Sequence, residues 1–148
     1  MCVLALFALP ICISDWRYRR IPNIYLLVML YPIALMHLFV GTQSLTVIFV
    51  ATLVAALLCF VGMGAGDAKL FVVVALALNL GNFGVLLLLT TSIYVVSIIQ
   101  AILMWLFSTR LPKSIPLAPA IFLGSALYLA ASMSTSLRQY ADALVNSW

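Results

Sequence analysis

Charged residues divide the chain into long apolar stretches. No Asp, Glu, Lys or Arg occurs in 21–66, 70–109 or 114–137. A helix needs about 20 apolar residues to cross the hydrocarbon core of a bilayer. The first two stretches therefore have room for two spans each and the third for one. Residues 1–14 form a further apolar run, so the pattern predicts six transmembrane helices.

Turn signals inside the two longer stretches set the boundaries of the expected helices. Both Val40–Ser44 and Asn79–Gly84 combine Gly with small polar residues, which indicates a chain reversal. The expected spans are 1–14, 24–40, 45–63, 69–82, 84–107 and 115–133. The first and the fourth are short for a hydrocarbon core about 30 Å thick.

Composition agrees with this membrane interpretation. The chain is 67% hydrophobic and 7% charged, and its mean hydropathy is +1.29, whereas soluble domains carry roughly 25% charged residues. It contains no internal repeat and no linker. We therefore expect an all-α, polytopic membrane protein with a single domain over residues 1–148.

The basic residues predict the orientation. Six of the seven fall on one side of a six-span path, namely Arg17, Arg19, Arg20, Lys69, Arg110 and Lys113. Only Arg138 falls on the other side. The positive-inside rule makes the first side cytoplasmic, so both chain ends face outward. Topology then accounts for the net charge of +4, and we expect the lipid bilayer, and no nucleic acid, as a partner.

The remaining polar features point to no metal or cofactor. The three cysteines are scattered in apolar runs without a C-x-x-C pair, and the chain has one histidine. Such a set does not favour a zinc site or a disulfide framework. In the tail, an apolar stripe over 137–148 has helical spacing and predicts a short interfacial helix on the outer face. Asp142 in that helix is then a solvated charge.

Two aspartates are the candidate catalytic residues. Asp15 and Asp67 both lie at the cytoplasmic end of an expected span, in the similar contexts Asp-x-Arg and Asp-x-Lys. Ionisable groups at membrane depth are functional candidates, although each carboxylate could simply pair with its basic neighbour. If the two share a partly dry site, one keeps its proton, and the pair acts as acid and base. That is the chemistry of aspartic peptidases.

Glycines precede the second aspartate. Gly62, Gly64 and Gly66 each lower helix stability by about 1 kcal/mol relative to Ala. The fold tolerates this cost if the backbone unwinds before Asp67, which lets an extended substrate approach the main chain. The alternative is close packing of helices at Gly62 and Gly66.

Three segments resemble motifs of the type IV prepilin peptidases. Gly64-Ala65-Gly66-Asp67 resembles their G-x-G-D motif, and Ala68-Lys69 follows it as in that family. Residues 14–23 are similar to the other aspartate motif, D-x-R-x-x-x-I-P-N, and residues 115–124 to the proline-rich start of the last span. The three segments come in the family's order and cover nearly the whole chain.

The resemblance implies a membrane aspartic endopeptidase that removes the short basic leader of prepilins, ahead of their hydrophobic helix. Cleavage is expected at the cytoplasmic face of the bacterial inner membrane. Asp15 and Asp67 match the catalytic pair, with Gly64, Gly66, Lys69 and Arg17 in support.

Members with an extra N-terminal domain carry paired C-x-x-C motifs and also methylate the new pilin terminus. This chain lacks that domain and resembles the short peptidases of Flp/Tad-type pilus systems. Methyltransferase activity is therefore not expected, and the oligomeric state stays open.

Several roles remain open at the level of sequence. Lys69 either neutralises the aspartate pair, orients the substrate, or anchors the helix at the cytoplasmic interface. Arg17 is the best candidate for tuning Asp15. Two other classes of protein fit the pattern less closely, a small proton-coupled transporter and a non-catalytic subunit of pilus assembly. No residue positioned as a base lies near Ser14 or Cys12 in the sequence, which argues against a nucleophilic peptidase.

Overall fold

A computed structural model describes residues 2–41, 45–60, 62–108 and 115–145. Over this part of the chain the fold is all-helical, which confirms the expected class, and it comprises six helices. They are α1 (Cys2–Tyr18), α2 (Asn23–Val40), α3 (Leu45–Phe60), α4 (Ala65–Ala77), α5 (Phe83–Ser108) and α6 (Ala118–Val145).

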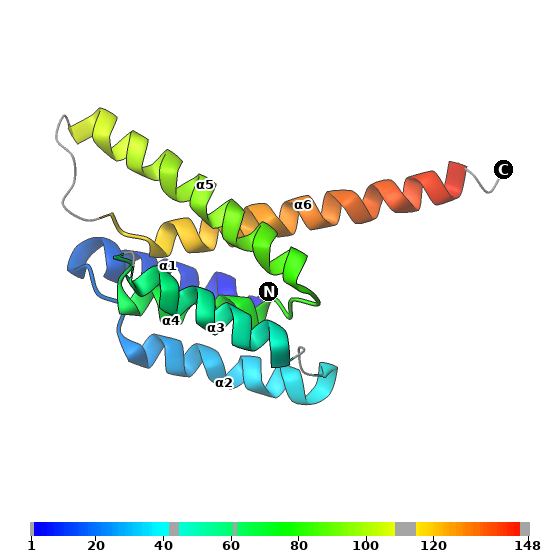
Figure 1. Cartoon of the computed structure of the whole chain (residues 1–148), viewed down its shortest axis with the longest axis horizontal. Coiled ribbons are helices and arrows are strands. Elements are labelled where there is room, and N and C mark those ends of the chain that lie inside the picture. The colour runs from blue at the N-terminus through cyan, green and yellow to red at the C-terminus, as the bar shows by residue number, and fades with distance from the viewer. Residues whose placement is uncertain (1, 42–44, 61, 109–114, 146–148) are drawn as a thin grey trace.

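The helices form a layered bundle. In Figure 1, α1, α3 and α4 lie between α2 on one side and the crossing pair α5 and α6 on the other. Consecutive helices run in opposite directions, so α1 ends at the same end of the bundle at which α2 and α4 begin. This end brings together the segments that carry Asp15 and Asp67.

The buried core is centred on α4, the shortest helix. Leu70, Phe71 and Val74 are almost fully inaccessible, and they pack with buried residues of neighbouring helices such as Ile11 and Met29. Because α4 has buried residues in each of its turns, the helix that carries Asp67 is held on several sides.

The helix α4 begins earlier than the sequence pattern predicts. The expected span starts at residue 69, whereas the helix starts at Ala65 and places Asp67 in its first turn. An acidic side chain is favourable there because it faces the positive end of the helix dipole. The backbone break lies upstream, where Gly62 has a φ of +108° and Gly64 is the extended N-cap. The backbone is therefore unwound before Asp67, as predicted, but the break is confined to Gly62–Gly64, and Gly66 already lies in the helix.

The helix α6 also differs from its predicted range. It starts at Ala118 and continues to Val145 without a break, so the short tail helix that the stripe predicted is the end of α6. Neither Gly nor Pro occurs between residues 125 and 145, and nothing in that stretch stops a helix. The side chain of Asp142 lies outside the described part of the structure.

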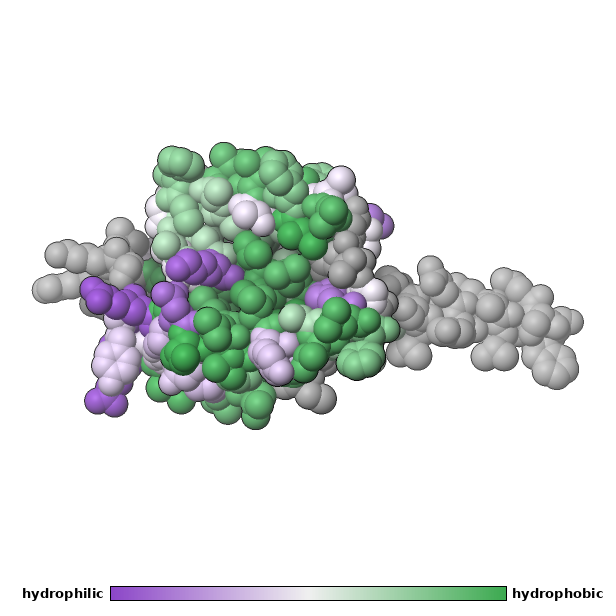
Figure 2. Space-filling view, turned by 90° about the horizontal axis from the view of Figure 1, so that it is seen from below, coloured by the Kyte–Doolittle hydropathy of each residue, from purple (hydrophilic) through white to green (hydrophobic). Residues whose placement is uncertain are grey.

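The described surface is strongly apolar. Figure 2 shows a face covered largely by hydrophobic residues, with several hydrophilic residues gathered at the end where α1 ends and α2 begins. Large side chains such as Phe39 and Phe60 are 88% and 89% exposed. Among the described residues, one helix is long and apolar enough to cross a membrane, Phe83–Phe107, and only 17% of its most apolar stretch is buried.

One polar contact joins the far ends of α2 and α4. The Nε2 atom of His37 lies 3.0 Å from the carbonyl oxygen of Leu76, to which it donates a hydrogen bond. The last carbonyls of a helix have no partner within that helix. The Leu76 carbonyl also accepts from the N–H of Asn79 at 3.1 Å, so His37 adds a second donor that ties α2 to the C-terminal end of α4.

Candidate active site

The two aspartates line one cavity of about 310 Å³ at the polar end of the bundle. Its walls come from the end of α1, the turn into α2 and the start of α4. The lining residues are Asp15, Arg19, Arg20, Ile21, Asn23, Gly64, Ala65, Gly66, Asp67 and Lys69. This aspartate pocket brings together five of the six site residues that the sequence suggested, and Arg17 is the exception.

The side chain of Asp15 is bound by the start of α6. Its side chain is 5% exposed, and its Oδ2 atom accepts a hydrogen bond of 3.0 Å from the backbone N–H of Ala118. Ala118 is the first residue of α6, so this N–H has no partner inside the helix and lies at the positive end of its dipole. The carboxylate therefore caps a helix from a distant part of the chain.

Opposing effects set the pKa of Asp15. Burial raises the pKa above its usual range, while the hydrogen bond from Ala118 and the positive charge of Arg19 act to lower it. The net direction is upward. Hydrogen bonding and positive charge nevertheless stabilise the ionised form of this carboxylate, and neither has a counterpart among the causes that shift the pKa of Asp67.

A tight turn after α1 builds the wall next to Asp15. The N–H of Arg19 donates to the carbonyl of Asp15 at 2.9 Å, and the Ser14 hydroxyl donates to the carbonyl of Arg20 at 3.1 Å. Arg19 has a φ of +52°, a left-handed conformation that reverses the chain direction. The turn directs Arg19 and Arg20 into the lining of the pocket.

Asp67 occupies a different environment. It is half-buried, and its Oδ1 atom is buried without a hydrogen-bond partner. Burial, and then the negative charge of Asp15, raise the pKa of Asp67 to about 7. A buried carboxyl oxygen without a donor favours the neutral acid.

Two of the expected glycines have a steric role beside Asp67. A Cβ atom on Gly64 would lie 2.9 Å from Oδ2 of Asp67, and one on Gly66 would lie 3.3 Å from Cβ of Ile21. Gly64 therefore leaves room for the carboxylate, and Gly66 lets α4 pack closely against the segment before α2.

The two basic residues that the sequence suggested, Lys69 and Arg17, lie in different places in the structure. The exposed Nζ atom of Lys69 donates to Oδ1 of Asn23 at 3.3 Å, joining α4 to the first residue of α2. Arg17 is exposed, and its guanidinium lies 5.6 Å from the ring centroid of Tyr18, in a cation–π contact. The arginine whose charge acts on Asp15 is Arg19.

Sequence reasoning did not identify Ala118 or Arg19 as site residues. A backbone donor has no side-chain signature, although Pro116 and Pro119 mark the start of a helix and hence a run of free N–H groups. The charge of Arg19 could not be separated from those of its neighbours without the turn at φ +52°. Among the described residues, no three His, Cys, Asp or Glu side chains are grouped so as to hold a metal ion.

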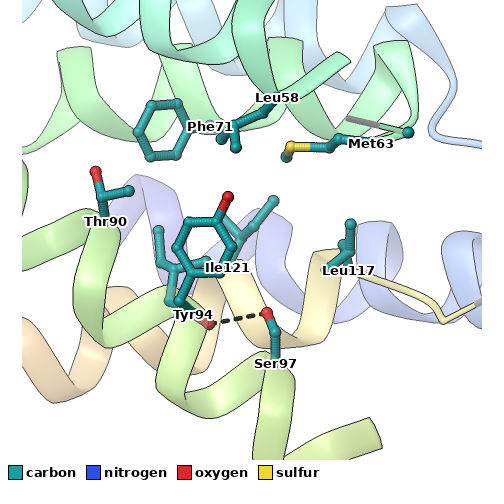
Figure 3. Close-up of a pocket in the computed structure, with 10 residues that line it drawn as sticks. Leu58, Met63, Phe71, Thr90, Tyr94, Ser97, Leu117 and Ile121 are labelled. Carbon is teal, nitrogen blue, oxygen red and sulfur yellow. Dashed lines mark hydrogen bonds between the residues drawn. The ribbon is translucent and has the colours of Figure 1, made fainter. Parts of the chain in front are cut away.

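A second cavity lies between α3, α4, α5 and the start of α6. It measures about 210 Å³. It is bordered by Met63 in the turn Gly62–Gly64, which we call the glycine turn, by Phe71 of α4 and by Leu117 just before α6. Figure 3 shows the Tyr94 side chain from α5 pointing across this cavity toward Leu58 and Met63. No acidic residue lines this cavity.

Comparison with known proteins identifies the family. Residues 2–108 match the model of the type IV leader peptidase family, which is more than two thirds of the chain. The chain belongs to the type IV leader peptidase family. No curated protein and no solved structure matches it. Membership implies that the protein is a leader peptidase acting on prepilin-type substrates.

The matched region of this leader peptidase includes both aspartates and the glycine turn, and it ends with α5. Ala118 lies beyond it. The contact between Asp15 and the start of α6 is therefore a feature that the three-dimensional structure adds to the family assignment.

Proposed function

We propose that the protein is a membrane-embedded aspartic endopeptidase that cleaves the leader from prepilins at the cytoplasmic face. The observation that carries the proposal is the single pocket shared by Asp15 and Asp67, in which the charge of one acts on the pKa of the other. Two interacting carboxyl groups that do not both ionise are the requirement of an aspartic peptidase.

The unequal surroundings of the two aspartates support unequal roles. Asp15, bonded to the N–H of Ala118, is the ionised base, and Asp67, with its unpartnered Oδ1 and raised pKa, is the acid. Asp15 takes a proton from water as the water oxygen attacks the scissile carbonyl carbon, and Asp67 gives its proton to the carbonyl oxygen. The tetrahedral diol then collapses. Asp15 passes its proton to the leaving amine, and Asp67 regains a proton from the diol.

A bilayer is the proposed environment. The high mean hydropathy, the exposed Phe and Leu side chains and the apolar helix Phe83–Phe107 support a membrane-embedded protein. The placement of the basic residues supports a six-span path with both ends outside. In that orientation the pocket lies at the cytoplasmic interface, where water reaches the aspartates and the basic residues face the cytoplasm.

Leader removal from a co-expressed Flp-type prepilin tests the proposal. Wild type, Asp15→Asn, Asp67→Asn and Asp142→Asn are compared by gel shift at equal membrane levels. Either of the first two changes is expected to reduce cleavage by at least about a thousandfold, because each removes a proton-transfer group of one catalytic unit. Asp142→Asn, the matched control, is expected to cleave like wild type.

The same assay separates the competing classes. Cleavage that persists in Asp15→Asn or Asp67→Asn would contradict the two-aspartate mechanism and favour a non-catalytic assembly subunit. If cleavage persists when either aspartate is replaced, and a proton-coupled flux is lost in both variants, the transporter class would be favoured.

A further inference from the structure

An open apolar groove runs along α2, α3 and α4 and measures about 720 Å³. Its lining residues are Asn23, Leu26, Leu27, Leu30, Thr52, Ala55, Ala56, Cys59, Ala65, Ala68, Lys69, Val72, Val73 and Leu76. Apart from Asn23, Thr52 and Lys69, these are apolar residues. We refer to this surface as the α2–α4 groove.

The groove is continuous with the aspartate pocket. Asn23, Ala65 and Lys69 line both cavities, and they lie at the end of the groove where α2 and α4 begin. From there the groove extends along α4 to Leu76, a distance of about 16 Å at the helical rise of 1.5 Å per residue. It thus leads from the two aspartates to the opposite end of α4.

Four alanines are among the residues that line the groove. Ala55 and Ala68 are buried, and Ala56 and Ala65 are exposed. Small side chains let the backbone of a neighbouring helix come close. Helices in a bilayer associate through such close packing, because lipid is as apolar as the helices and the hydrophobic effect does not drive them together. The groove therefore suits a helix better than it suits a bulky polar ligand.

We propose that the α2–α4 groove binds the hydrophobic helix of the substrate, the segment that follows the scissile bond. The proposal rests on the proposed peptidase function. With this helix in the groove, the chain that precedes it enters the aspartate pocket past Asn23 and Lys69, and its leader lies on the polar side. The groove then supplies binding and register, while the two aspartates supply the chemistry.

Other apolar cavities lack this continuity. The cavity of Figure 3, the groove between α1 and α6, and the one between α5 and α6 share no lining residue with the aspartate pocket. The groove between α1 and α6 measures about 510 Å³ and is lined by Cys12. This cysteine provides a matched control, because Cys59 lines the α2–α4 groove and both side chains are partly accessible.

Disulfide cross-linking tests the location directly. The inactive Asp67→Asn variant, also carrying Cys2→Ser, is made with Cys59 as its single cysteine or with Cys12 as its single cysteine. Each is co-expressed with a prepilin that has one cysteine scanned through its hydrophobic helix, and membranes are oxidised with copper phenanthroline. We expect cross-links to Cys59 at every third or fourth pilin position and none to Cys12. Cross-links to Cys12 alone, or to neither cysteine, would overturn the proposal.

A steric block provides an independent functional test. Ala56→Trp fills the groove from an exposed position, and Ala130→Trp places the same side chain on an exposed position of α6 outside the described cavities. Cleavage of intact prepilin is expected to fall at least tenfold in Ala56→Trp. A peptide that spans the scissile bond but lacks the hydrophobic helix is expected to be cut at the wild-type rate, and Ala130→Trp to change neither reaction.

The two proposals fail in different ways. If the Asp15→Asn and Asp67→Asn variants are inactive but Ala56→Trp cuts intact prepilin like wild type, the peptidase function stands and the groove assignment is wrong. If cleavage survives loss of either aspartate, the peptidase mechanism itself fails, whatever the cross-links show.

Discussion

The two aspartates reach the same pocket from regions that give their carboxyl groups different surroundings. Asp15, at the end of α1, is buried, receives the N–H of Ala118 and lies near the charge of Arg19. Asp67, in the first turn of α4, is more open to the pocket, yet one of its oxygens is buried without a donor. Burial raises the pKa of both carboxyl groups. The difference between them comes from the N–H at the start of α6 and the charge of Arg19, which act on Asp15 and have no counterpart at Asp67.

Among changes that keep both aspartates, moving the Asp67 carboxylate is expected to have the largest effect. Gly64→Ala places a Cβ atom 2.9 Å from Oδ2 of Asp67, and the side chain must shift while the backbone is undisturbed. We expect kcat to fall about 10- to 100-fold, since displacement of a reacting group by about 1 Å costs roughly that much, with thermal stability near wild type. Gly81→Ala, at a glycine with open space around its Cβ position, is the control. Equal rates in both variants would contradict the role of Gly64.

Raising the pH above 7 is expected to reduce activity through Asp67, because Asp15 is the partner that is already ionised. Because the pKa of Asp67 is raised to about 7, the acid loses its proton as pH rises through that value. The value of kcat/KM on a leader peptide should therefore fall about tenfold per pH unit above pH 7. Measurement in detergent from pH 5 to 9 checks this, and a rate that stays constant to pH 9 would assign the proton elsewhere.

Replacing Asp15 and replacing Asp67 should change the free energy of unfolding in opposite directions. Asp15→Ala leaves the N–H of Ala118 buried without an acceptor and is expected to lower the free energy of unfolding by about 1–3 kcal/mol. Asp15→Asn keeps an acceptor oxygen and should recover most of that loss while remaining inactive. Thermal unfolding in detergent measures both, and equal stability of the two variants would show that the Ala118 contact contributes little.

Asp67→Asn is expected to act in the opposite direction. The folded-state pKa of about 7 lies above the ordinary value of 3.8, so the folded state favours the protonated acid. The contribution of Asp67 to wild-type stability is therefore complete below pH 4 and is lost as pH rises from 4 through 7. Asparagine does not ionise, so the variant should exceed wild type in Tm at pH 8 and approach it at pH 4. A difference in Tm that does not change with pH would contradict this.

The smallest effect is expected from the arginines. Removing the charge of Arg19 takes away a cause that lowers the pKa of Asp15, and the acidic limb of the pH–rate profile should move upward by less than about one pH unit. Arg17→Ala, whose guanidinium lies over Tyr18, should leave that limb in place. Equal shifts in the two variants would mean that general charge, rather than position, sets the pKa.

Much of the fold follows from the distribution of charged residues. Long apolar runs and Gly-containing turns placed α2 and α5 within one residue of their observed ends. The errors occurred where the local pattern is compatible with more than one outcome. An apolar stripe has the same period whether its helix is separate or continues α6, and a glycine-rich segment does not reveal which glycine breaks the helix.

The site was predictable only as far as it rests on side chains. Asp15, Asp67, Gly64, Gly66 and Lys69 were recognised from scarce charges and motif spacing, and the structure brings them to one pocket. The asymmetry between the aspartates was not predictable, because it depends on the N–H of Ala118, a group that every residue except proline carries. Only the packing of α6 against the end of α1 gives that group a specific role.

The length of α4 has a consequence for the surroundings of the site. Its 13 residues extend about 20 Å, whereas the hydrocarbon core is about 30 Å thick. Neighbouring helices bury α4 on several sides, so this shortfall in length lies inside the protein and does not face the lipid. The aspartate pocket lies at the first turn of this short helix. In the proposed bilayer, the short helix therefore leaves space for water within the protein itself, at the level of the two aspartates, and the surrounding lipid keeps its thickness.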